Sequence, residues 1–377
     1  MEENGSGGVL TVSIEKVADL PRKMKAVVNY APSDFRLEEV DVPDIGPGEV
    51  LVKVGGCGIC AGDLKTFHGA PRIWGGEGHP AYVKTPVIPG HEFYGQVVAL
   101  GEGAKEKYGF SLGDWVVSEQ IIPCGVCRFC VEGDYWMCER HYIYGFKRGE
   151  ADGAFAEYMK FPANAVNHKL PEGFPLRVAP YVEPLGCAIH AVERAEIQFR
   201  DVVVIAGMGA IGLGMLQVAR LQNPRVLIAV DVIEKRLALA KKLGADVVLN
   251  PQTVDAIAEV KKLTDGYGCD VYIHASGHPQ GVIQGLQMIR RLGRYVEFSV
   301  FNQPTSVDWS IIGDVKELDI RGAHLSPWTY PEAIRFLHQG LVKADEIITH
   351  EFPLTEFKKA MEIAENGEES IRVVLKP

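Results

Sequence analysis

The stretch VVVIAGMGAIGLGMLQVA at residues 202–219 decides the fold class of this chain. Its first five residues are apolar and mostly β-branched, which is typical of a strand buried on both faces. Glycines at 207, 209, 212 and 214 then interrupt the apolar run. A membrane-spanning helix is the alternative for a run of this length. The glycines and the β-branched start instead favour a buried strand, a tight turn and the start of a helix.

Apolar runs recur at short intervals after this stretch. We predict a sheet that contains Val202–Ala206 and five later strands, at Val226–Asp231, Val247–Leu249, Val271–Ala275, Tyr295–Val300 and Leu318–Ala323. The residues between them include helical stretches, and one of these, Ile233–Leu243, ends at Gly244 as helices commonly do. Strands that alternate with helices favour a doubly wound parallel sheet of the Rossmann type, which we place at residues 186–324.

The remainder of the chain has a different pattern. Short β-rich runs separated by Gly and Pro favour a compact, mostly antiparallel β domain at residues 24–185; the runs are Lys25–Asn29, Glu49–Val54, Gln96–Leu100 and Trp115–Ser118. The tail at residues 325–377 contains helices and a last strand, Ile371–Leu375. Residues 1–23 are polar and acidic, and we interpret them as an N-terminal extension. The sequence therefore predicts an α/β protein.

The glycines after the first buried strand form a dinucleotide-binding pattern. Gly207, Gly209 and Gly212 are spaced G-x-G-x-x-G, so that the turn can be tight and a pyrophosphate can lie at the helix N-terminus. Asp231 ends the next strand, where a carboxylate accepts hydrogen bonds from ribose hydroxyls and repels a 2′-phosphate. The sequence thus favours NAD over NADP. The alternatives are a glycine turn that serves only helix–sheet packing and, for Arg236, a solvated helix face instead of a place beside the ribose.

Four of the eight cysteines lie in one short segment. They are spaced C-x2-C-x2-C-x7-C, at Cys124, Cys127, Cys130 and Cys138. Four thiolates suit a closed tetrahedral zinc site with a structural role. An iron–sulfur cluster is the alternative, but its motif ends C-x3-C-P, whereas the last gap here is longer and Glu139 stands where Pro would. Disulfides and unliganded core thiols explain this spacing less well.

Other metal-binding residue types are spread along the chain. Cys60 lies in GICAGD, His91 and Glu92 lie in PGHEFYG, and Glu183 lies in EPLG. Taken singly, a buried His is more often a satisfied core residue, and a lone Cys is more often a small hydrophobe. Sequence spacing alone does not show that these four residues meet in space.

Composition and charge limit the partners of the protein. Hydrophobic residues make up 47% of the chain and charged residues 23%, which is ordinary for a soluble globular protein. The net charge of −10 disfavours nucleic acid or an anionic membrane as the main partner. The first 23 residues contain no apolar run that would fit a signal peptide. We expect a cytoplasmic protein.

Taken together and in this order, the motifs resemble the zinc-containing medium-chain alcohol dehydrogenases over about residues 24–377. The matching segments are Gly58–Asp63, Gly90–Glu92, the four-cysteine segment, Gly153–Tyr158, the glycine pattern and Ser370–Arg372. The resemblance implies a GroES-like catalytic domain, made of residues 24–185 and 325–377, around an inserted NAD-binding domain. It also implies two zinc ions per chain and a homo-oligomer, either a tetramer or a dimer.

The resemblance assigns roles to individual residues. It implies that Cys60 and His91 bind a catalytic zinc, and that Glu92 or Glu183 completes the shell with water. Glu183 stands where many members have a third Cys ligand, which is similar to the polyol (sorbitol) dehydrogenase branch. Asp63 resembles the acid that orients the zinc-bound His. The resemblance further implies cofactor contacts for Ile211, Ser299, His324 and, at the pyrophosphate, Arg372.

One departure from the family affects the proton path. Members commonly have Ser two residues after the catalytic Cys and His five residues after it, as a proton relay. Those positions are Gly62 and Lys65 here. We therefore expect Lys65, His68 or ordered water to carry the proton.

A second departure affects the substrate. Leu325-Ser326 replaces the Arg–Tyr pair that sorbitol dehydrogenases have near the nicotinamide. Residues 71–82, with Trp74, His79 and Tyr82, are long enough to form a lid over a small polar substrate, although a plain surface loop is the alternative.

The combination predicts a zinc-dependent, NAD-linked dehydrogenase that oxidises an alcohol to a carbonyl. From overall similarity, including residues 57–65, the chain resembles erythritol/L-threitol dehydrogenases, so that a four-carbon polyol is the expected substrate. Oxidation of sorbitol, butanediol or threonine is the alternative within the same class. A non-catalytic NAD-binding regulator that keeps only the fold and the structural zinc is the alternative from another class.

Overall fold

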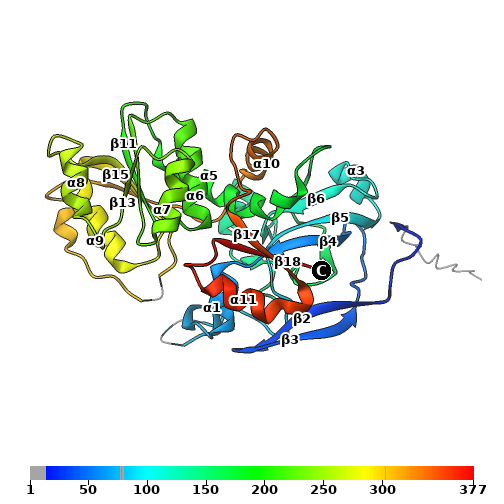
Figure 1. Ribbon diagram of the computed structural model, residues 1–377. Coiled ribbons are helices and arrows are strands. Elements are labelled where there is room, and N and C mark those ends of the chain that lie inside the picture. Colours follow the sequence, from blue (N-terminus) through cyan, green and yellow to red (C-terminus); the bar gives the residue numbers. More distant parts are fainter. Residues whose placement is uncertain (1–13, 77, 79, 302) are drawn as a thin grey trace, which may run out of the picture.

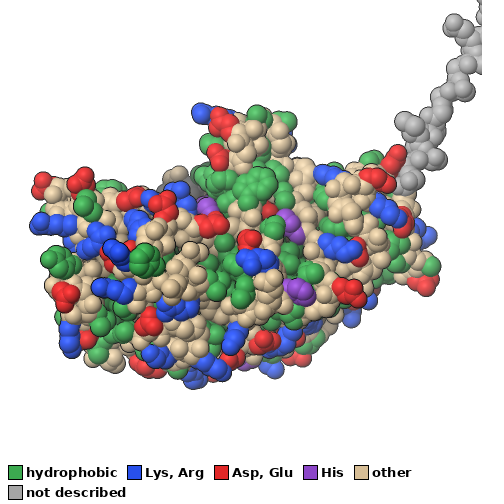
Figure 2. Space-filling view, turned by 90° about the horizontal axis from the view of Figure 1, so that it is seen from above, with side chains coloured by type: hydrophobic (Ala, Val, Ile, Leu, Met, Phe, Trp, Pro, Cys, Tyr) green, Lys and Arg blue, Asp and Glu red, His purple; other side chains and the backbone are tan. Residues whose placement is uncertain are grey.

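Two lobes lie side by side in the computed structural model, which describes residues 14–76, 78, 80–301 and 303–377 (Figure 1). One lobe contains a parallel sheet between helices, and the other consists mainly of antiparallel strands. Within the described residues, no helix has both the length and the apolar character that a bilayer crossing requires. Figure 2 shows acidic and basic side chains interspersed over one face, without a continuous basic stripe.

The parallel sheet has the strand order β13-β12-β11-β14-β15-β16. All five of its strand pairs are parallel, and the order reverses between β11 and β14, which is where ligands bind in doubly wound folds. The predicted strands are confirmed with shifted ends; they are β11 (Val202–Ala206), β12 (Val226–Val230), β13 (Val247–Leu249), β14 (Cys269–His274), β15 (Ile289–Glu297) and β16 (Asp319–Gly322).

Alternating side chains of β11 explain why both faces of this sheet carry helices. Val203 and Ile205 pack into one hydrophobic cluster, whereas Val202 and Val204 belong to another on the opposite face. Helices α5, α6, α7 and α10 contribute to the first cluster, and α8 and α9 contribute to the second. The helices of this half are α5 (Val182–Ala195), α6 (Ala210–Leu221), α7 (Glu234–Lys242), α8 (Ala256–Lys262), α9 (Pro279–Met288), α10 (Tyr330–His338) and the short η3 (Trp309–Ile311).

The other lobe is built on a sheet with the order β10-β6-β5-β4-β18-β17, to which β1 adds beside β5 and β9 beside β4. Its strands are β1 (Glu15–Lys16), β4 (Val50–Gly58), β5 (Glu92–Leu100), β6 (Trp115–Ser118), β9 (Tyr158–Phe161), β10 (Asn167–Lys169), β17 (Ile348–Pro353) and β18 (Arg372–Lys376). Two smaller pairs are β2 (Lys23–Ala31) with β3 (Asp34–Asp41), and β7 (Ile121–Ile122) with β8 (Tyr142–Ile143). The helices are α1 (Ala61–Phe67), α2 (Pro71–Trp74), α3 (Ala104–Tyr108), α4 (Arg128–Glu132), η1 (Tyr135–Met137), η2 (Leu176–Tyr181), η4 (Leu354–Glu356) and α11 (Phe357–Glu365).

The C-terminal tail enters the sheet of the first half of the chain. β18, the predicted last strand, pairs with β4 and also with β17, which the sequence did not reveal. β17 reads ITHEFP and lies at the edge of the sheet, and its three consecutive polar residues, 349–351, break the alternation of polar and apolar side chains that indicates a strand. The antiparallel pairing of β18 with β4 places Arg372, at the start of β18, beside the residues that follow β4.

Part of the predicted N-terminal extension belongs to this sheet. Glu15 and Lys16 pair with Leu100 and Ala99 of β5. Residues 1–13 lie outside the described residues.

Candidate functional site

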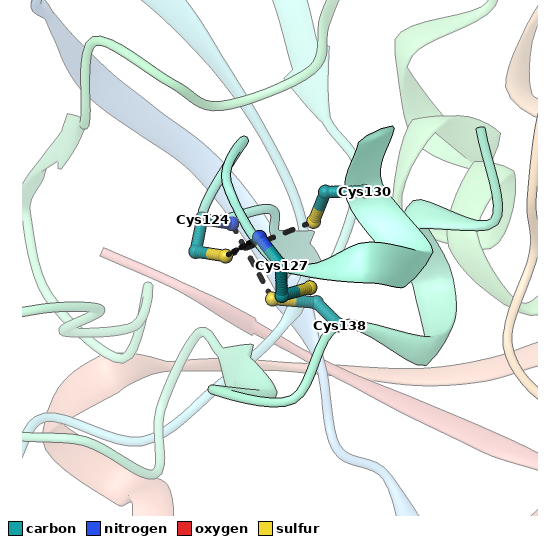
Figure 3. A group of neighbouring side chains, drawn as sticks. All are labelled: Cys124, Cys127, Cys130 and Cys138. Atoms are coloured by element: carbon teal, nitrogen blue, oxygen red, sulfur yellow. Dashed lines mark hydrogen bonds between the residues drawn. The ribbon is translucent and has the colours of Figure 1, made fainter. Parts of the chain in front are cut away.

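The four clustered cysteines converge on one point (Figure 3). Cys124 follows β7, Cys127 precedes α4, Cys130 lies within α4 and Cys138 follows η1. Their sulfur atoms all lie within 4.8 Å of one another. A short helix and a tight 3-10 turn thus gather ligands that are already close in sequence.

Backbone donors surround these sulfurs. The amide of Cys124 donates to Cys138 Sγ at 3.3 Å, and the amide of Cys127 donates to Cys124 Sγ at 3.3 Å. The N–H groups of Val126 and Cys127 lower the pKa of the Cys124 thiol to about 6. Four sulfur donors, one of them readily ionised, fit a thiolate-bound metal without a position for substrate.

A second group combines three different donor types. Sγ of Cys60, a ring nitrogen of His91 and a carboxylate oxygen of Glu92 lie within 4.8 Å of one another. Antiparallel pairing of β4 with β5 places Glu92 opposite Gly58 and brings His91 beside the turn that carries Cys60. Strand register therefore assembles residues that are far apart in the sequence.

Two buried atoms in this group lack a hydrogen-bond partner. They are His91 Nδ1 and Glu92 Oε2, and burying such atoms unpaired is costly. Sulfur, nitrogen and oxygen donors together are those that zinc takes in proteins. The three donors fit a bound zinc ion, and such an ion would satisfy Glu92 Oε2, which the described residues leave unpaired.

Neighbouring charges hold the three donors in place. Asp63 accepts a hydrogen bond from the Cys60 amide at 2.9 Å, and its other oxygen lies 3.8 Å from His91 Nδ1. Nη1 of the buried Arg372 donates to Glu92 Oε1 at 2.8 Å and to the Ile59 carbonyl at 2.8 Å. Asp63 thus links Cys60 to His91, and Arg372 leaves only Oε2 of Glu92 unpaired. The predicted contact of Arg372 with the pyrophosphate stays a prediction.

Glu183 is close to this group but is not part of it. It lies on α5, is buried, and accepts a weak bond from Cys187 Sγ at 3.5 Å. Burial, followed by the charge of Glu92, raises the pKa of Glu183 to about 7. A buried chain continues from Cys187 to the Gln120 amide at 3.5 Å and from Gln120 to Ser326 Oγ at 2.7 Å. The family resemblance offered Glu92 or Glu183 as the ligand that completes the shell, and the structure brings only Glu92 into the group.

The two residues considered for proton transfer point in different directions. Lys65, on α1, donates from Nζ to the Val300 carbonyl of the other lobe at 2.8 Å. Burial lowers the pKa of Lys65. His68 faces away and meets Glu365 at 2.9 Å, and both side chains are about half exposed. Of the two, Lys65 is the one that reaches between the lobes.

The glycine turn between β11 and α6 has the expected geometry. Gly207 has a φ of +100°, and a Cβ at Gly212 would lie 1.8 Å from the Gly207 carbonyl oxygen. Both oxygens of Asp231 accept backbone hydrogen bonds, from Met208 at 2.6 Å and from Ile233 at 2.8 Å. The carboxylate therefore lies beside the turn, where the pattern predicts a ribose.

The remaining predicted cofactor residues have varied surroundings. Arg236 donates to the Gly367 carbonyl at 2.8 Å, with Nη1 near Gly209. Ile211 packs partly buried against the core of the parallel-sheet lobe. Ser299 Oγ accepts from the Gly277 amide at 3.1 Å. Nε2 of the exposed His324 lies 2.9 Å from Nε2 of His141.

Sequence reasoning did not single out His141. The contact between His141 and His324 joins the two lobes, and no local motif indicates it because the residues are distant in sequence. The segment considered as a lid is anchored at two points: Trp74 donates to the Thr66 carbonyl at 2.7 Å, and Tyr82 donates to the His141 carbonyl at 2.7 Å. His79 lies outside the described residues.

Comparison with known proteins agrees with both lobes. Residues 46–172 match the alcohol dehydrogenase GroES-like domain, and residues 210–339 match the zinc-binding dehydrogenase family. The chain is 52% identical to an erythritol/L-threitol dehydrogenase of Mycolicibacterium smegmatis, over 95% of this chain and 99% of that one. It is 35% identical to a sorbitol dehydrogenase of Halalkalibacterium halodurans, over 94% and 99% of the two chains.

A solved structure gives the same result for the fold. A zinc-binding dehydrogenase from Sinorhizobium meliloti 1021, bound to NADP, superimposes with a TM-score of 0.84 at 26% identity, over 94% of this chain and 99% of that one. The fold class predicted from the sequence, a GroES-like domain with a Rossmann domain, is confirmed. The chain belongs to the zinc-containing medium-chain alcohol dehydrogenase family and is an oxidoreductase that uses zinc and a nicotinamide cofactor.

Proposed function

We propose that this protein oxidises a secondary hydroxyl of a four-carbon polyol, such as erythritol or threitol, to a ketose such as erythrulose, with NAD as the hydride acceptor. The observation that carries the proposal is 52% identity to an erythritol/L-threitol dehydrogenase over 95% of the chain. The replacement of the Arg–Tyr pair of sorbitol dehydrogenases by Leu325-Ser326 also favours a substrate other than a six-carbon polyol.

The proposed catalytic centre uses Cys60, His91 and either Glu92 or Glu183 as zinc ligands. Zinc held there would supply a Lewis acid that lowers the pKa of the substrate hydroxyl, as zinc in other sites lowers the pKa of bound water to about 7. Asp63 and Arg372 orient the ligands through the hydrogen bonds described above. We propose Lys65 as the acceptor of the proton that leaves the hydroxyl; its Nζ reaches between the lobes and burial lowers its pKa, which supports this role. We propose the four clustered cysteines as a separate structural zinc site.

NAD is the proposed cofactor, held by the glycine turn, Asp231 and, beside the ribose, Arg236. Ile211, Ser299, His324 and Arg372 are proposed as further cofactor contacts. Asp231 would repel a 2′-phosphate. We therefore expect kcat/KM with NAD to exceed kcat/KM with NADP by at least about tenfold, which corresponds to about 1.4 kcal/mol of charge repulsion. Asp231→Ser should reduce this ratio. Equal efficiency with the two cofactors in the native protein would contradict the assignment.

Three further features are proposed from the family resemblance. The catalytic domain consists of residues 24–185 and 325–377, and the NAD-binding domain of residues 186–324. The protein forms a homo-oligomer, a dimer or tetramer, and acts in the cytoplasm.

A rate comparison tests the substrate. Initial rates with NAD should be measured on erythritol, both threitols, sorbitol, 2,3-butanediol, threonine and ethanol. A site built for several hydroxyls has polar groups that stay unpaired when a simple alcohol binds. We therefore expect kcat/KM for ethanol to be lower than that for the four-carbon polyols by a factor of at least about one hundred. A tenfold preference for butanediol, threonine or ethanol over every four-carbon polyol would refute the polyol assignment and leave the dehydrogenase assignment intact.

A further inference from the structure

A hydrogen-bonded array lies apart from the metal-binding groups, at the carboxyl ends of β14 and β15. It consists of Ser276, His274 and Glu297. His274 Nε2 lies 2.7 Å from Ser276 Oγ, and His274 Nδ1 lies 2.9 Å and 3.1 Å from the two oxygens of Glu297. His274 is completely buried, at 0% exposure, whereas Ser276 is exposed. A buried imidazole and a partly buried carboxylate thus support one serine at the surface.

The contacts of Glu297 fix the direction of these hydrogen bonds. Its carboxylate also accepts from the Tyr295 hydroxyl at 3.2 Å and from the Ser299 amide at 2.8 Å, which is the behaviour of an ionised group that only accepts. Nδ1 of His274 therefore carries the hydrogen and donates it to Glu297. In the neutral imidazole, Nε2 then has no hydrogen, and it accepts the hydroxyl hydrogen of Ser276.

Ser276 consequently presents only acceptor capacity to the outside. Its hydroxyl hydrogen points inward to His274, and the His278 amide donates to Oγ at 3.2 Å. One lone pair of the oxygen remains. An oxygen with this polarity can receive a hydrogen bond from a hydroxyl group but has nothing to offer a phosphate oxygen.

The position of Ser276 indicates which hydroxyl it would meet. A Cβ at Gly207 would lie only 2.7 Å from Cα of Ser276, so the serine adjoins the glycine turn. β14 neighbours β11 on the side opposite β12, and Asp231 follows β12. A dinucleotide with its adenosine ribose at Asp231 and its pyrophosphate at the turn therefore continues over β14. Lys65 of the other lobe approaches on this side, at Val300.

We propose that Ser276 is a further cofactor-contact residue, whose hydroxyl oxygen accepts a hydrogen bond from a hydroxyl of the nicotinamide-side ribose. His274 and Glu297 are positioning residues that hold the serine in this direction. The proposal rests on the NAD assignment above, and it does not depend on the polyol.

Binding of the cofactor without substrate tests the proposal. Titration calorimetry should give the Kd of NAD for the native zinc-loaded protein, Ser276→Ala, Ser276→Thr and, as a matched control at an exposed serine, Ser306→Ala. Loss of one neutral hydrogen bond predicts an increase in Kd of about three- to tenfold for Ser276→Ala. Ser276→Thr keeps the hydroxyl and should recover at least half of that loss, and Ser306→Ala should change nothing.

Analogues of NAD that lack the 2′- or the 3′-hydroxyl of the nicotinamide-side ribose distinguish a direct contact from a general disturbance. For one of the two analogues, native protein and Ser276→Ala should have the same Kd. Glu297→Gln, which removes the charge that fixes the His274 hydrogen, should weaken NAD about two- to threefold and leave binding of that same analogue unchanged.

Two results would overturn the proposal. One is a Kd of NAD that is the same in Ser276→Ala as in the native protein. The other is a Kd that Ser276→Ala raises by the same factor for NAD and for both analogues. Thermal unfolding of each variant shows that it is folded. A native protein that does not bind NAD would refute the cofactor assignment itself. A native protein that binds NAD but does not oxidise polyols would refute only the substrate assignment, and the proposed Ser276 contact would be unaffected.

Discussion

The two metal-binding groups of this protein differ in how the chain assembles them. The four cysteines lie in one short segment, share one donor type and are held by their own backbone amides. Cys60, His91 and Glu92 are brought together by strand pairing, have three donor types and include two buried atoms without partners. The first group is closed and suits a structural metal. The second is open, and charged residues around it adjust its chemistry.

Turnover should depend almost entirely on the open group. Cys60→Ser removes its only sulfur, and loss of Lewis-acid stabilisation costs several kcal/mol, or about a thousandfold in kcat. The melting temperature should change little. Cys57→Ala, which removes a buried thiol three residues earlier, in β4, is the matched control and should retain most activity. Near-native turnover in Cys60→Ser would mean that the open group is not the catalytic centre.

Folding should depend more on the closed group. Cys124→Ser breaks a site whose metal binding contributes to folding, so we expect the melting temperature to fall by roughly 5 °C or more. Any folded fraction should keep a near-native kcat per active site. Both quantities can be followed by thermal unfolding and active-site titration. The distinction between the two groups would fail if Cys124→Ser lost kcat while its melting temperature stayed native.

In protein without the catalytic metal, the pH dependence of the free energy of unfolding should reveal the ionisation of Glu183, which lies beside the open group. Burial raises the pKa of Glu183 from 4.5 to about 7. A carboxyl group whose pKa is higher in the folded state contributes full stability below pH 4.5 and loses it as the pH rises through 7. Protein without the catalytic metal should therefore lose stability between pH 5 and pH 8, by about 1.4 kcal/mol per unit of pKa shift.

Glu183→Gln isolates this contribution. The variant cannot ionise, so its free energy of unfolding in urea should fall less between pH 5 and pH 8 than that of the parent. Glu172→Gln, at an exposed glutamate, should behave like the parent. Identical pH dependence in Glu183→Gln and the parent would contradict the raised pKa.

A smaller effect is expected at Lys65. Because burial lowers the pKa of Lys65, its neutral amine becomes available as a base at a lower pH than that of an exposed lysine. Lys65→Met should lower kcat by about tenfold to a hundredfold and remove the rising limb of the pH profile of oxidation, without loss of zinc. Lys53→Met, at an exposed lysine, is the control. An unchanged profile would assign the proton path to water.

The sequence predicted the parts of this molecule that local patterns determine. The parallel strands, the glycine turn and the four-cysteine segment all have signals within a few residues, and β11 could be identified because it is apolar throughout. β17 was not predicted because its three consecutive polar residues lack the alternation of polar and apolar side chains that indicates a strand. The meeting of Cys60 with His91 depends on the register of β4 and β5, so only family resemblance indicated it. The contact of His141 with His324 and the direction of the Ser276 hydroxyl need the three-dimensional fold.

Zinc content tests the contrast between a closed and an open site most directly. Elemental analysis of fully loaded native protein, Cys60→Ser and Cys124→Ser should be done after gentle dialysis. We expect about two zinc ions per chain in the native protein, as one structural and one catalytic site require, and about one in each variant. Iron with sulfide, or a single zinc per native chain, would contradict the account.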